Sequence, residues 1–429
     1  MDAKSEREKA HNRSIIRMKN ACVLVTAVQI SELPTAISYP DNILDQGIKT
    51  GQARVVKTYF ISISILMWSQ GHRTAVRASN LQRLFTRTFI SSTTMSIPKT
   101  QKAILQPDVM STEVTMITDP VPAAKPSSDE HLIRVHTTAI TNGELLWSRY
   151  FPLPKGEEPE KILVPCNDVA GTVITAPEDS PFKPGTEVYA RANYNRTGCA
   201  REYTILLTEE MSKRPQNLSW AESAVVPMSA ETAWQALFEH VGWEAKAGEG
   251  ARGKRIFITA ASGGVGVWMV QLAKWAGAHV TATCGTSNVD WVQSLGADEV
   301  LDYTKTDIKQ WANGEDKKVD VAIDCIGQKS LEDAWWTVKG GGTLISIYQP
   351  PEQKKPAGVE DNIRNFFFIM KSVGEQLQMV TNLIEAGIGK PALDSVFPVD
   401  RFQDAFKKVE SGKTRGKVVL EFASNSSSM

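Results

Sequence analysis

The residues with the clearest chemical potential form a glycine-rich turn in the middle of the chain. Residues 254–266, KRIFITAASGGVG, run from an apolar strand pattern through a turn into a helical pattern. Ala261, Gly263 and Gly266 occupy the three small-residue positions of a G-x-G-x-x-G motif. Gly263 lets the backbone approach a pyrophosphate, and Gly266 lets the helix pack against the strand. An ordinary tight turn is the alternative, but the flanking strand and helix favour a dinucleotide site.

The phosphates of a dinucleotide lie at the N-terminus of such a helix, where unpaired N–H groups and the helix dipole favour negative charge. The turn therefore predicts these cofactor-binding residues: Ser262, Gly263, Gly264, Val265 and Gly266.

The type of dinucleotide is indicated by the segment about twenty residues beyond the turn, where an NAD site carries Asp or Glu for the ribose 2′-hydroxyl. Here residues 283–287 read TCGTS and contain no carboxylate. Small hydroxyl residues leave room for a 2′-phosphate, so NADP(H) is favoured over NAD(H). No Arg or Lys follows closely, so the cation facing that phosphate must come from elsewhere in the fold.

The elements around the turn predict an α/β protein. Residues 99–207 read as short alternating strands cut by Pro and Gly, which is typical of a β-rich domain. From 220 to 347, strands alternate with helices, which predicts βαβ units and a doubly wound parallel sheet. The tail, 362–422, adds helices, a strand around 396–398 and a closing strand over 417–422 that returns to the β domain.

Composition excludes several classes of protein. The 429 residues carry 48 basic and 48 acidic side chains, so no global charge favours nucleic acid. No apolar run reaches the ~20 residues that cross a bilayer. The five cysteines contain no C-x-x-C pair, which argues against a disulfide framework or a zinc knuckle.

The N-terminal region is basic and unlike the rest. No acidic residue lies between Asp45 and Asp108, and the stretch from Met67 is rich in Arg, Ser and Thr, as in a mitochondrial transit peptide. Residues 87–92, RTFISS, resemble the Arg-x-Phe-x-x-Ser signal of matrix precursors, which predicts a matrix protein whose mature chain starts between Phe89 and Ile97. The alternative is a cytoplasmic protein that starts at Met95.

Seven segments resemble the medium-chain dehydrogenase/reductase superfamily, in its zinc-free quinone reductase and enoyl reductase branch. Fungal zinc-binding-oxidoreductase-like proteins and reticulon-interacting-type NADPH oxidoreductases are the nearest kinds. The matching segments are 165–173 PCNDVAGTV, 198–203 GCAREY, 231–237 ETAWQAL, 260–266 AASGGVG, 295–303 LGADEVLDY, 324–327 DCIG and 415–420 RGKVVL.

The resemblance implies a GroES-like catalytic domain interrupted by a Rossmann NADP-binding domain. The expected boundaries are 1–94 for an N-terminal extension, 95–219 for the catalytic domain, 220–360 for the Rossmann domain and 361–429 for the return to the catalytic domain.

The resemblance also assigns roles to residues outside the turn. Ser287 and Tyr303 are expected near the adenosine 2′-phosphate, Gly327 near the nicotinamide ribose and Lys417 near the cleft. For Tyr303 the alternative is a packed aromatic that ends a strand. For Lys417 it is a solvated charge at a strand end.

Zinc-binding relatives hold the catalytic metal through a Cys and a His, ligands that suit this ion. At those positions the chain has Thr141 and Asn167, and the clustered four-cysteine lobe of the structural zinc is missing. We therefore expect no metal site. Without a Lewis acid, reduction by hydride delivery is more natural than alcohol oxidation, because it needs mainly orientation and oxyanion stabilisation.

The proton donor and the carbonyl-binding group are less well defined. Asn142 lies one place after the Asn that zinc-free relatives keep near the substrate, and Tyr150 precedes the Phe151-Pro152 pair where enoyl thioester reductases have Tyr-Pro. We name Asn142 and Tyr150 as candidate catalytic residues. Tyr194 and Tyr203 are further candidates.

These features predict a zinc-independent NADPH-dependent oxidoreductase that delivers hydride to a quinone or an α,β-unsaturated carbonyl. The alternatives are a 2-enoyl thioester reductase of fatty-acid or polyketide assembly and a non-catalytic NADPH-binding interaction protein. The expected partner is a small-molecule substrate, with no nucleic acid and no membrane span. A homodimer is compatible with this interpretation.

Overall fold

Two larger sheets organise the part of the chain that the computed structural model describes, which is residues 97–125, 128–150 and 162–423. The basic N-terminal region, with its expected transit peptide and start sites, and the Phe151-Pro152 pair lie outside the described residues. None of the helices in the described ranges is long and apolar enough to cross a bilayer.

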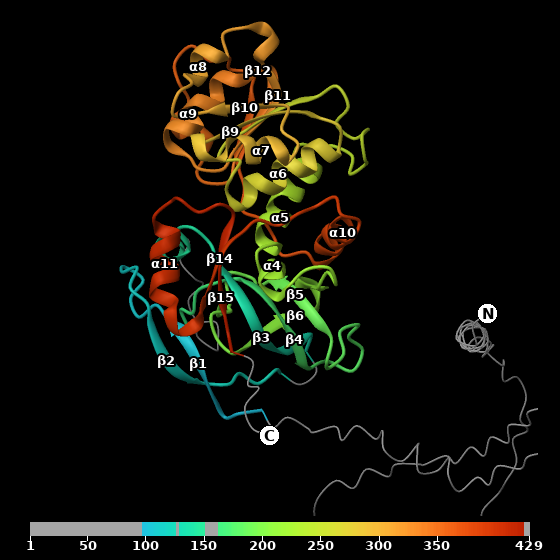
Figure 1. Ribbon diagram of the computed structural model, residues 1–429, viewed down its shortest axis with the longest axis vertical. Helices are drawn as coiled ribbons and strands as arrows, with labels where there is room; N and C mark the ends of the chain where they lie inside the picture. The colour runs from blue at the N-terminus through green and yellow to red at the C-terminus, as the bar shows by residue number, and fades with distance from the viewer. Residues whose placement is uncertain (1–96, 126–127, 151–161, 424–429) are drawn as a thin grey trace, which may run out of the picture. The chain divides into compact units, whose positions relative to one another are not determined.

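The first sheet is parallel throughout, with strand order β10-β9-β8-β11-β12-β13. This confirms the expected doubly wound arrangement (Figure 1). Its strands are β8 (Arg255–Ile258), β9 (His279–Cys284), β10 (Glu299–Asp302), β11 (Val319–Asp324), β12 (Val338–Ser346) and β13 (Arg364–Phe367).

The last strand differs from expectation. β13 pairs with β12 through Thr343↔Arg364 to Ser346↔Phe367. The parallel sheet therefore continues past residue 360, the expected end of the Rossmann domain. Its sequence, RNFF, is short and does not alternate between polar and apolar residues, so the sequence does not predict a strand there. Pairing with β12 makes this segment a strand.

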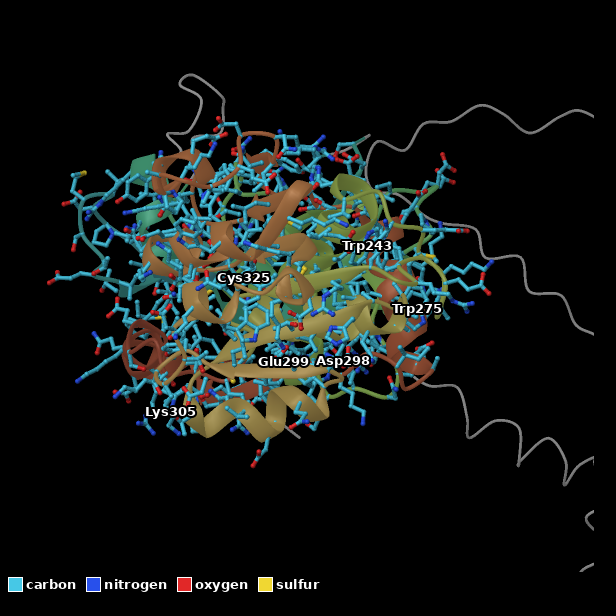
Figure 2. The ribbon with its side chains drawn as sticks, turned by 90° about the horizontal axis from the view of Figure 1, so that it is seen from above. Trp243, Trp275, Asp298, Glu299, Lys305 and Cys325 are labelled. Carbon is cyan, nitrogen blue, oxygen red and sulfur yellow. The ribbon has the colours of Figure 1, made fainter. Side chains whose placement is uncertain are left out.

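Helices connect the strands of this sheet: α6 (Gly264–Trp275), α7 (Val289–Ser294), α8 (Ile308–Trp311) and α9 (Gln328–Thr337). Figure 2 looks onto this half from above. Asp298 and Glu299 lie close together at the start of β10, and Lys305, just beyond the other end of that strand, lies apart from them at the lower left of the view. Because every neighbouring pair of strands in this sheet is parallel, the carboxyl ends of the strands share one edge of the sheet.

The second sheet is mainly antiparallel, with order β14-β15-β3-β4-β5-β7 and β6 paired to β3. The closing strand returns as expected, because β15 pairs with β3 through Val418↔Ile140. The strands of this half, including the separate β1-β2 pair, are β1 (Thr100–Leu105), β2 (Thr115–Pro120), β3 (Glu130–Ile140), β4 (Asp168–Thr175), β5 (Glu187–Arg191), β6 (Tyr203–Leu207), β7 (Met211–Lys213), β14 (Leu393–Pro398) and β15 (Lys417–Glu421).

The remaining helices belong to this half or to the junction of the two halves: α3 (Trp147–Tyr150), α4 (Trp220–Ala224), α5 (Pro227–Trp234), α10 (Gly374–Glu385) and α11 (Phe402–Glu410). Ser219 and Glu222 form a capping box that starts α4, and Pro227 occupies the first turn of α5, where its missing N–H costs no hydrogen bond. α4 packs on β3 and β4, and α5 packs on α6. These two helices therefore link the sheets (Figure 1).

A second link is made by backbone alone. Gly416, one residue before β15, forms a parallel bridge with Gly263, and its N–H donates to the Ser262 carbonyl at 2.9 Å. Gly416 has a φ of 78°, and a Cβ there would lie 2.1 Å from the Ala392 carbonyl oxygen, so only glycine fits. This contact holds residues 415–417, at the start of β15 in the half built on the second sheet (the catalytic half of the expected organisation), against the glycine-rich turn.

Candidate functional site

Two glycines of the glycine-rich turn differ in how much room surrounds them. A Cβ at Gly266 would lie 2.3 Å from the Ala260 carbonyl oxygen and 2.6 Å from Ala261 Cα, which no side chain tolerates. A Cβ at Gly263 would meet only the Ala260 carbonyl oxygen, at 3.2 Å. Gly263 also begins α6 without a capping side chain, so the first N–H groups of this helix are open to a ligand. The turn therefore fits a dinucleotide pyrophosphate.

The carboxyl edge of the sheet continues this surface. Gly327, at φ 76°, follows β11, and a Cβ there would lie 2.3 Å from a ring carbon of Tyr348. The buried Asp324 carboxylate ties the edge together, because it accepts hydrogen bonds from the Gly327 N–H at 2.8 Å and from the Thr259 and Ser346 hydroxyls at 3.0 Å. Burial raises the pKa of Asp324.

An exposed apolar side chain follows each of three strands that end at this edge. Ile326, Tyr348 and Ile369 follow β11, β12 and β13 and are all exposed. In open parallel sheets, ligands bind beyond the carboxyl ends of the strands, so these residues offer an apolar lining there.

The expected adenosine end of the site contains Ser287 and Tyr303. Ser287 lies in a short 3₁₀ turn, Thr286–Asn288, after β9. Tyr303 follows β10 and is 60% exposed, and its hydroxyl would lie 3.6 Å from a Cβ at Gly285. The alternative of a packed aromatic is therefore wrong for Tyr303.

A cationic side chain from the other half of the molecule lies beside Ser287 in the fold. The Arg415 guanidinium donates to the Asn288 side-chain oxygen at 3.0 Å and to the Ser287 carbonyl at 3.3 Å. It also lies 4.8 Å from the centre of the Trp291 ring. The sequence does not predict this contact, because it joins residues 128 positions apart; Arg415 stands there only within the matching segment 415–420.

A carboxylate also lies near this end, although the sequence directly after β9 has none. Asp302, at the end of β10, accepts hydrogen bonds from the Thr286 hydroxyl at 2.6 Å and the Thr304 hydroxyl at 2.7 Å, and Lys305 pairs with it at 3.3 Å. The two hydroxyls hold the pKa of Asp302 well below its usual range. Parallel pairing of β10 with β9 places it there, which a count along the sequence does not reveal.

The second cluster lies where the catalytic half meets the turn. Lys417, the first residue of β15, is 6% exposed and forms an ion pair with Asp168, which is fully buried. The Lys417 ammonium also donates to the Thr141 hydroxyl at 2.9 Å, and the Met228 N–H donates to the other Asp168 oxygen at 2.7 Å. A Cβ at Gly264 would lie 3.0 Å from Lys417 Cγ, so the lysine passes directly beside the turn. The alternative of a solvated strand-end charge is therefore wrong for Lys417.

Behind Thr141 lies a buried carboxyl group. Glu144 accepts hydrogen bonds from the backbone N–H groups of Thr141 and Cys166, both at 3.2 Å, and the Cys166 thiol donates to it at 3.6 Å. Burial raises the pKa of Glu144 to about 7, opposed most strongly by the positive charge of Lys417. Burial also raises the pKa of the Cys166 thiol well above its usual range.

The two positions where relatives carry zinc ligands take part in these contacts. Thr141 bonds Lys417, and the buried Asn167 side chain donates to the Ala192 carbonyl at 3.1 Å. Among the described residues, no group of three or more His, Cys, Asp or Glu side chains is placed to hold a metal ion.

The two candidate catalytic residues are not brought into this cluster. Asn142 is exposed, and Tyr150, at the end of α3, is 69% exposed. Tyr194 is closer to the buried region: its hydroxyl donates to the Ser148 hydroxyl at 3.5 Å, and its ring meets Trp147 edge to face. Tyr203 begins β6 and its backbone N–H donates to the Gln101 side chain at 2.7 Å.

Comparisons with known proteins identify the family. A family model described as zinc-binding dehydrogenase matches residues 295–420. The chain is 50% identical over 330 residues to a probable zinc-binding oxidoreductase, mitochondrial, of Arthroderma benhamiae. This match covers 76% of this chain and 98% of that protein. The chain belongs to the medium-chain dehydrogenase/reductase superfamily. It is an oxidoreductase of this superfamily.

More distant relatives agree with this assignment. The chain is 32% identical over 290 residues to NAD(P)H oxidoreductase RTN4IP1, mitochondrial, of mouse, covering 62% of this chain and 72% of that protein. It is 33% identical over 309 residues to the chloroplast envelope quinone oxidoreductase homolog of Arabidopsis thaliana, covering 70% and 92%. The structure of the quinone oxidoreductase from Coxiella burnetii has the same fold, with a TM-score of 0.61 at 23% identity, over 75% of this chain and 99% of that one.

Proposed function

We propose that this superfamily member is a zinc-independent, NADPH-dependent reductase of quinones or α,β-unsaturated carbonyls. The reduced nicotinamide cofactor supplies the hydride, and the protein binds both reactants and stabilises the charge that develops on the substrate oxygen. The names of its relatives include a quinone oxidoreductase homolog and an NADPH-dependent alkenal/one oxidoreductase, which supports this substrate class.

The observation that carries the proposal is the path of residues 415–417. Arg415 reaches Ser287 and Asn288, Gly416 bonds to the glycine-rich turn, and Lys417 enters the buried cluster with Asp168 and Thr141. One short segment therefore connects the adenosine end of the cofactor site to the catalytic half.

The same cluster supports zinc independence. An ammonium group anchored by a buried carboxylate bonds the residue at the first lost ligand position, Thr141. Thr141, Asn167 and the lone Cys166 do not make a donor set that suits zinc, although the family model and one relative carry zinc in their names.

Arg415 supports NADPH over NADH. A guanidinium binds phosphate with charge-assisted, often bidentate hydrogen bonds, and the hydroxyl of the exposed Tyr303 lies beside Gly285, two residues before Ser287. Asp302 is the competing feature, since a carboxylate suits an NAD ribose, but its oxygens are engaged by Thr286, Thr304 and Lys305.

Calorimetric titration of the full chain with NADPH and NADH tests the cofactor assignment. Arg415→Gln is expected to weaken NADPH binding about 10- to 100-fold, as for a lost charge-assisted hydrogen bond of ~1.5–3 kcal/mol, and to leave NADH binding unchanged. Arg401→Gln is the matched control, because Arg401 pairs with Asp404 on the surface. Tighter binding of NADH than NADPH by the unaltered protein, or an equal loss for both cofactors, contradicts the assignment.

Turnover of three acceptors tests the substrate class. The proposal expects reduction of a quinone or an enone by protein that retains no stoichiometric zinc. Preference for an enoyl-CoA thioester identifies the thioester reductase instead, and cofactor binding without turnover of any acceptor identifies a non-catalytic binding protein.

The proposed location is the mitochondrial matrix. The names of two relatives include this organelle, and the stretch between Asp45 and Asp108, which carries Arg and Lys but no acidic residue, is attracted by the matrix potential, at ~2.3 kcal/mol per charge per 100 mV. N-terminal sequencing of the native protein is expected to give a start between Phe89 and Ile97. A chain in the cytosolic fraction that begins at Met95 or Ser96 contradicts this proposal.

A further inference from the structure

The half-buried Thr141 hydroxyl is held so that its own proton points away from its strongest partner. Its oxygen accepts a hydrogen bond from the Lys417 ammonium at 2.9 Å, so this bond uses the lysine's proton. The hydroxyl's own proton faces the Met228 sulfur at 3.4 Å. A thioether is a weak acceptor, so a carbonyl oxygen replaces it readily.

The Lys417 side chain is held in place, and its ammonium group is buried, so water screens its charge poorly. Asp168 pairs with the ammonium, and the Met228 N–H fixes the carboxylate in turn. A charge held in a water-poor site acts on a neighbouring hydroxyl more strongly than the same charge in water. The ammonium therefore polarises the Thr141 O–H bond and strengthens it as a hydrogen-bond donor.

The backbone of Thr141 is also held in place. Its N–H donates to Glu144, which is 7% exposed and also receives the Cys166 N–H. By contrast, the neighbouring Asn142 is exposed. Thr141 is thus positioned from both its backbone and its side chain, as an oxyanion-binding group must be.

We infer that the Thr141 hydroxyl, rather than Asn142, binds the carbonyl oxygen of the substrate, and that Lys417 is its positioning residue. The inference rests on the proposed function and names the group that stabilises the developing charge. When hydride adds to the carbon β to the carbonyl, a C–H bond forms there and the π electrons shift until the oxygen is negative. The substrate is reduced, the nicotinamide is oxidised, and the proton that completes the product comes from solvent.

Two substitutions at Thr141 separate the hydroxyl from its shape. Thr141→Val is expected to lower kcat about 10²–10³-fold, the usual loss for one oxyanion donor, with NADPH affinity within about twofold of the unaltered protein. Thr141→Ser keeps the hydroxyl and is expected to stay within about fivefold. An unchanged kcat in Thr141→Val, or an equal loss in Thr141→Ser, overturns the inference.

The role of Lys417 is tested by coupling rather than by a single change. Lys417→Met alone leaves Asp168 buried without its partner, so the charge is removed in the pair Lys417→Met with Asp168→Asn, which still accepts from the Met228 N–H. Adding Thr141→Val to this pair is expected to cost less than about threefold more in kcat, because the two groups act as one unit. If the loss of kcat in the triple variant equals the product of the losses in Thr141→Val and in the Lys417→Met/Asp168→Asn pair, Lys417 is not a positioning residue for Thr141.

A binding measurement keeps this test separate from the proposed function. 4-Nitrophenolate carries a fixed oxyanion, and its absorbance reports binding to the complex with NADP⁺ without any turnover. Thr141→Val is expected to weaken its binding about 10-fold, and Thr141→Ser is expected to preserve it. Equal binding to the Val variant, or no binding to the unaltered protein, overturns the inference even if quinones are reduced. If the anion binds as expected and no acceptor is reduced, only the proposed function fails.

Discussion

The glycine-rich turn and the Lys417 cluster lie against each other but are built by opposite means. The turn is local: its form comes from consecutive small residues between a strand and a helix, and Gly266 is required by backbone atoms six residues away or fewer. The cluster is assembled from β3, β4, α5 and β15, and buried charge holds it together. The turn tolerates no added atom at Gly266, and the cluster does not tolerate the loss of one charge while its partner stays buried.

Substitutions within the turn give the largest expected difference. Gly266→Val forces a Cβ to within 2.3 Å of the Ala260 carbonyl oxygen, so we expect a loss of unfolding free energy above ~4 kcal/mol. Gly263→Val meets only one atom, at 3.2 Å, so we expect stability within ~1 kcal/mol of the unaltered protein but no binding of NADPH. Thermal unfolding with and without NADPH measures both. A Gly263→Val protein that binds NADPH normally shows that the phosphates do not approach this residue.

This contrast also explains what the sequence could predict. The alternation of strands and helices over 220–347 and the helix after the turn are predicted from the sequence and confirmed, because the periodicity of apolar residues is a local property of the chain. The positions of Arg415 and Asp302 beside Ser287 and Thr286 could not be predicted, since both residues are placed by pairing between distant segments. The alternative interpretation of Lys417 as a solvated charge is wrong for the same reason, because its partner Asp168 lies far away in the sequence.

Loss of the Lys417 charge is the next largest effect. Lys417→Met leaves the fully buried Asp168 without its ammonium partner, and we expect ~3–5 kcal/mol of lost stability by chemical denaturation. Adding Asp168→Asn is expected to restore most of it. Lys102→Met is the control, because Lys102 pairs with Asp400 at 3.0 Å on the surface and such pairs contribute ~0–1 kcal/mol. Equal losses for the two lysines mean that the buried pair is not the anchor of the cluster.

Glu144 gives the cluster a pH dependence that the turn lacks. Its folded pKa of about 7 lies above the usual 4.5, so between these values the unfolded chain ionises while the folded protein stays protonated. Stability is therefore expected to fall as pH rises from 4.5 to 7, by an amount on the order of 2–3 kcal/mol at 1.36 kcal/mol per unit. Glu144→Gln keeps the shape and removes the titration. If the difference between the two proteins does not change over this range, Glu144 is ionised in the fold.

His136, on β3, gives an effect of the opposite sign, which we expect to be smaller because the His136 ring is only half-buried and solvent screens it. It stacks on Trp220 at 4.1 Å and bonds the Thr172 hydroxyl at 2.9 Å, and burial lowers its pKa from 6.5 to about 4. The neutral ring is favoured by the fold, so as pH falls from 6.5 to 4 the unfolded chain takes up a proton that the folded protein does not. Stability is expected to fall in that direction. His136→Phe retains the stacking and should flatten the dependence, as measured by urea unfolding across this range. Glu144 and His136 shift stability in opposite senses over overlapping pH ranges, so the effect of His136→Phe is also measured in a Glu144→Gln background. If His136→Phe alters the free energy of unfolding equally at pH 7 and pH 4.5, the His136 ring takes up its proton as readily in the folded protein as in the unfolded chain.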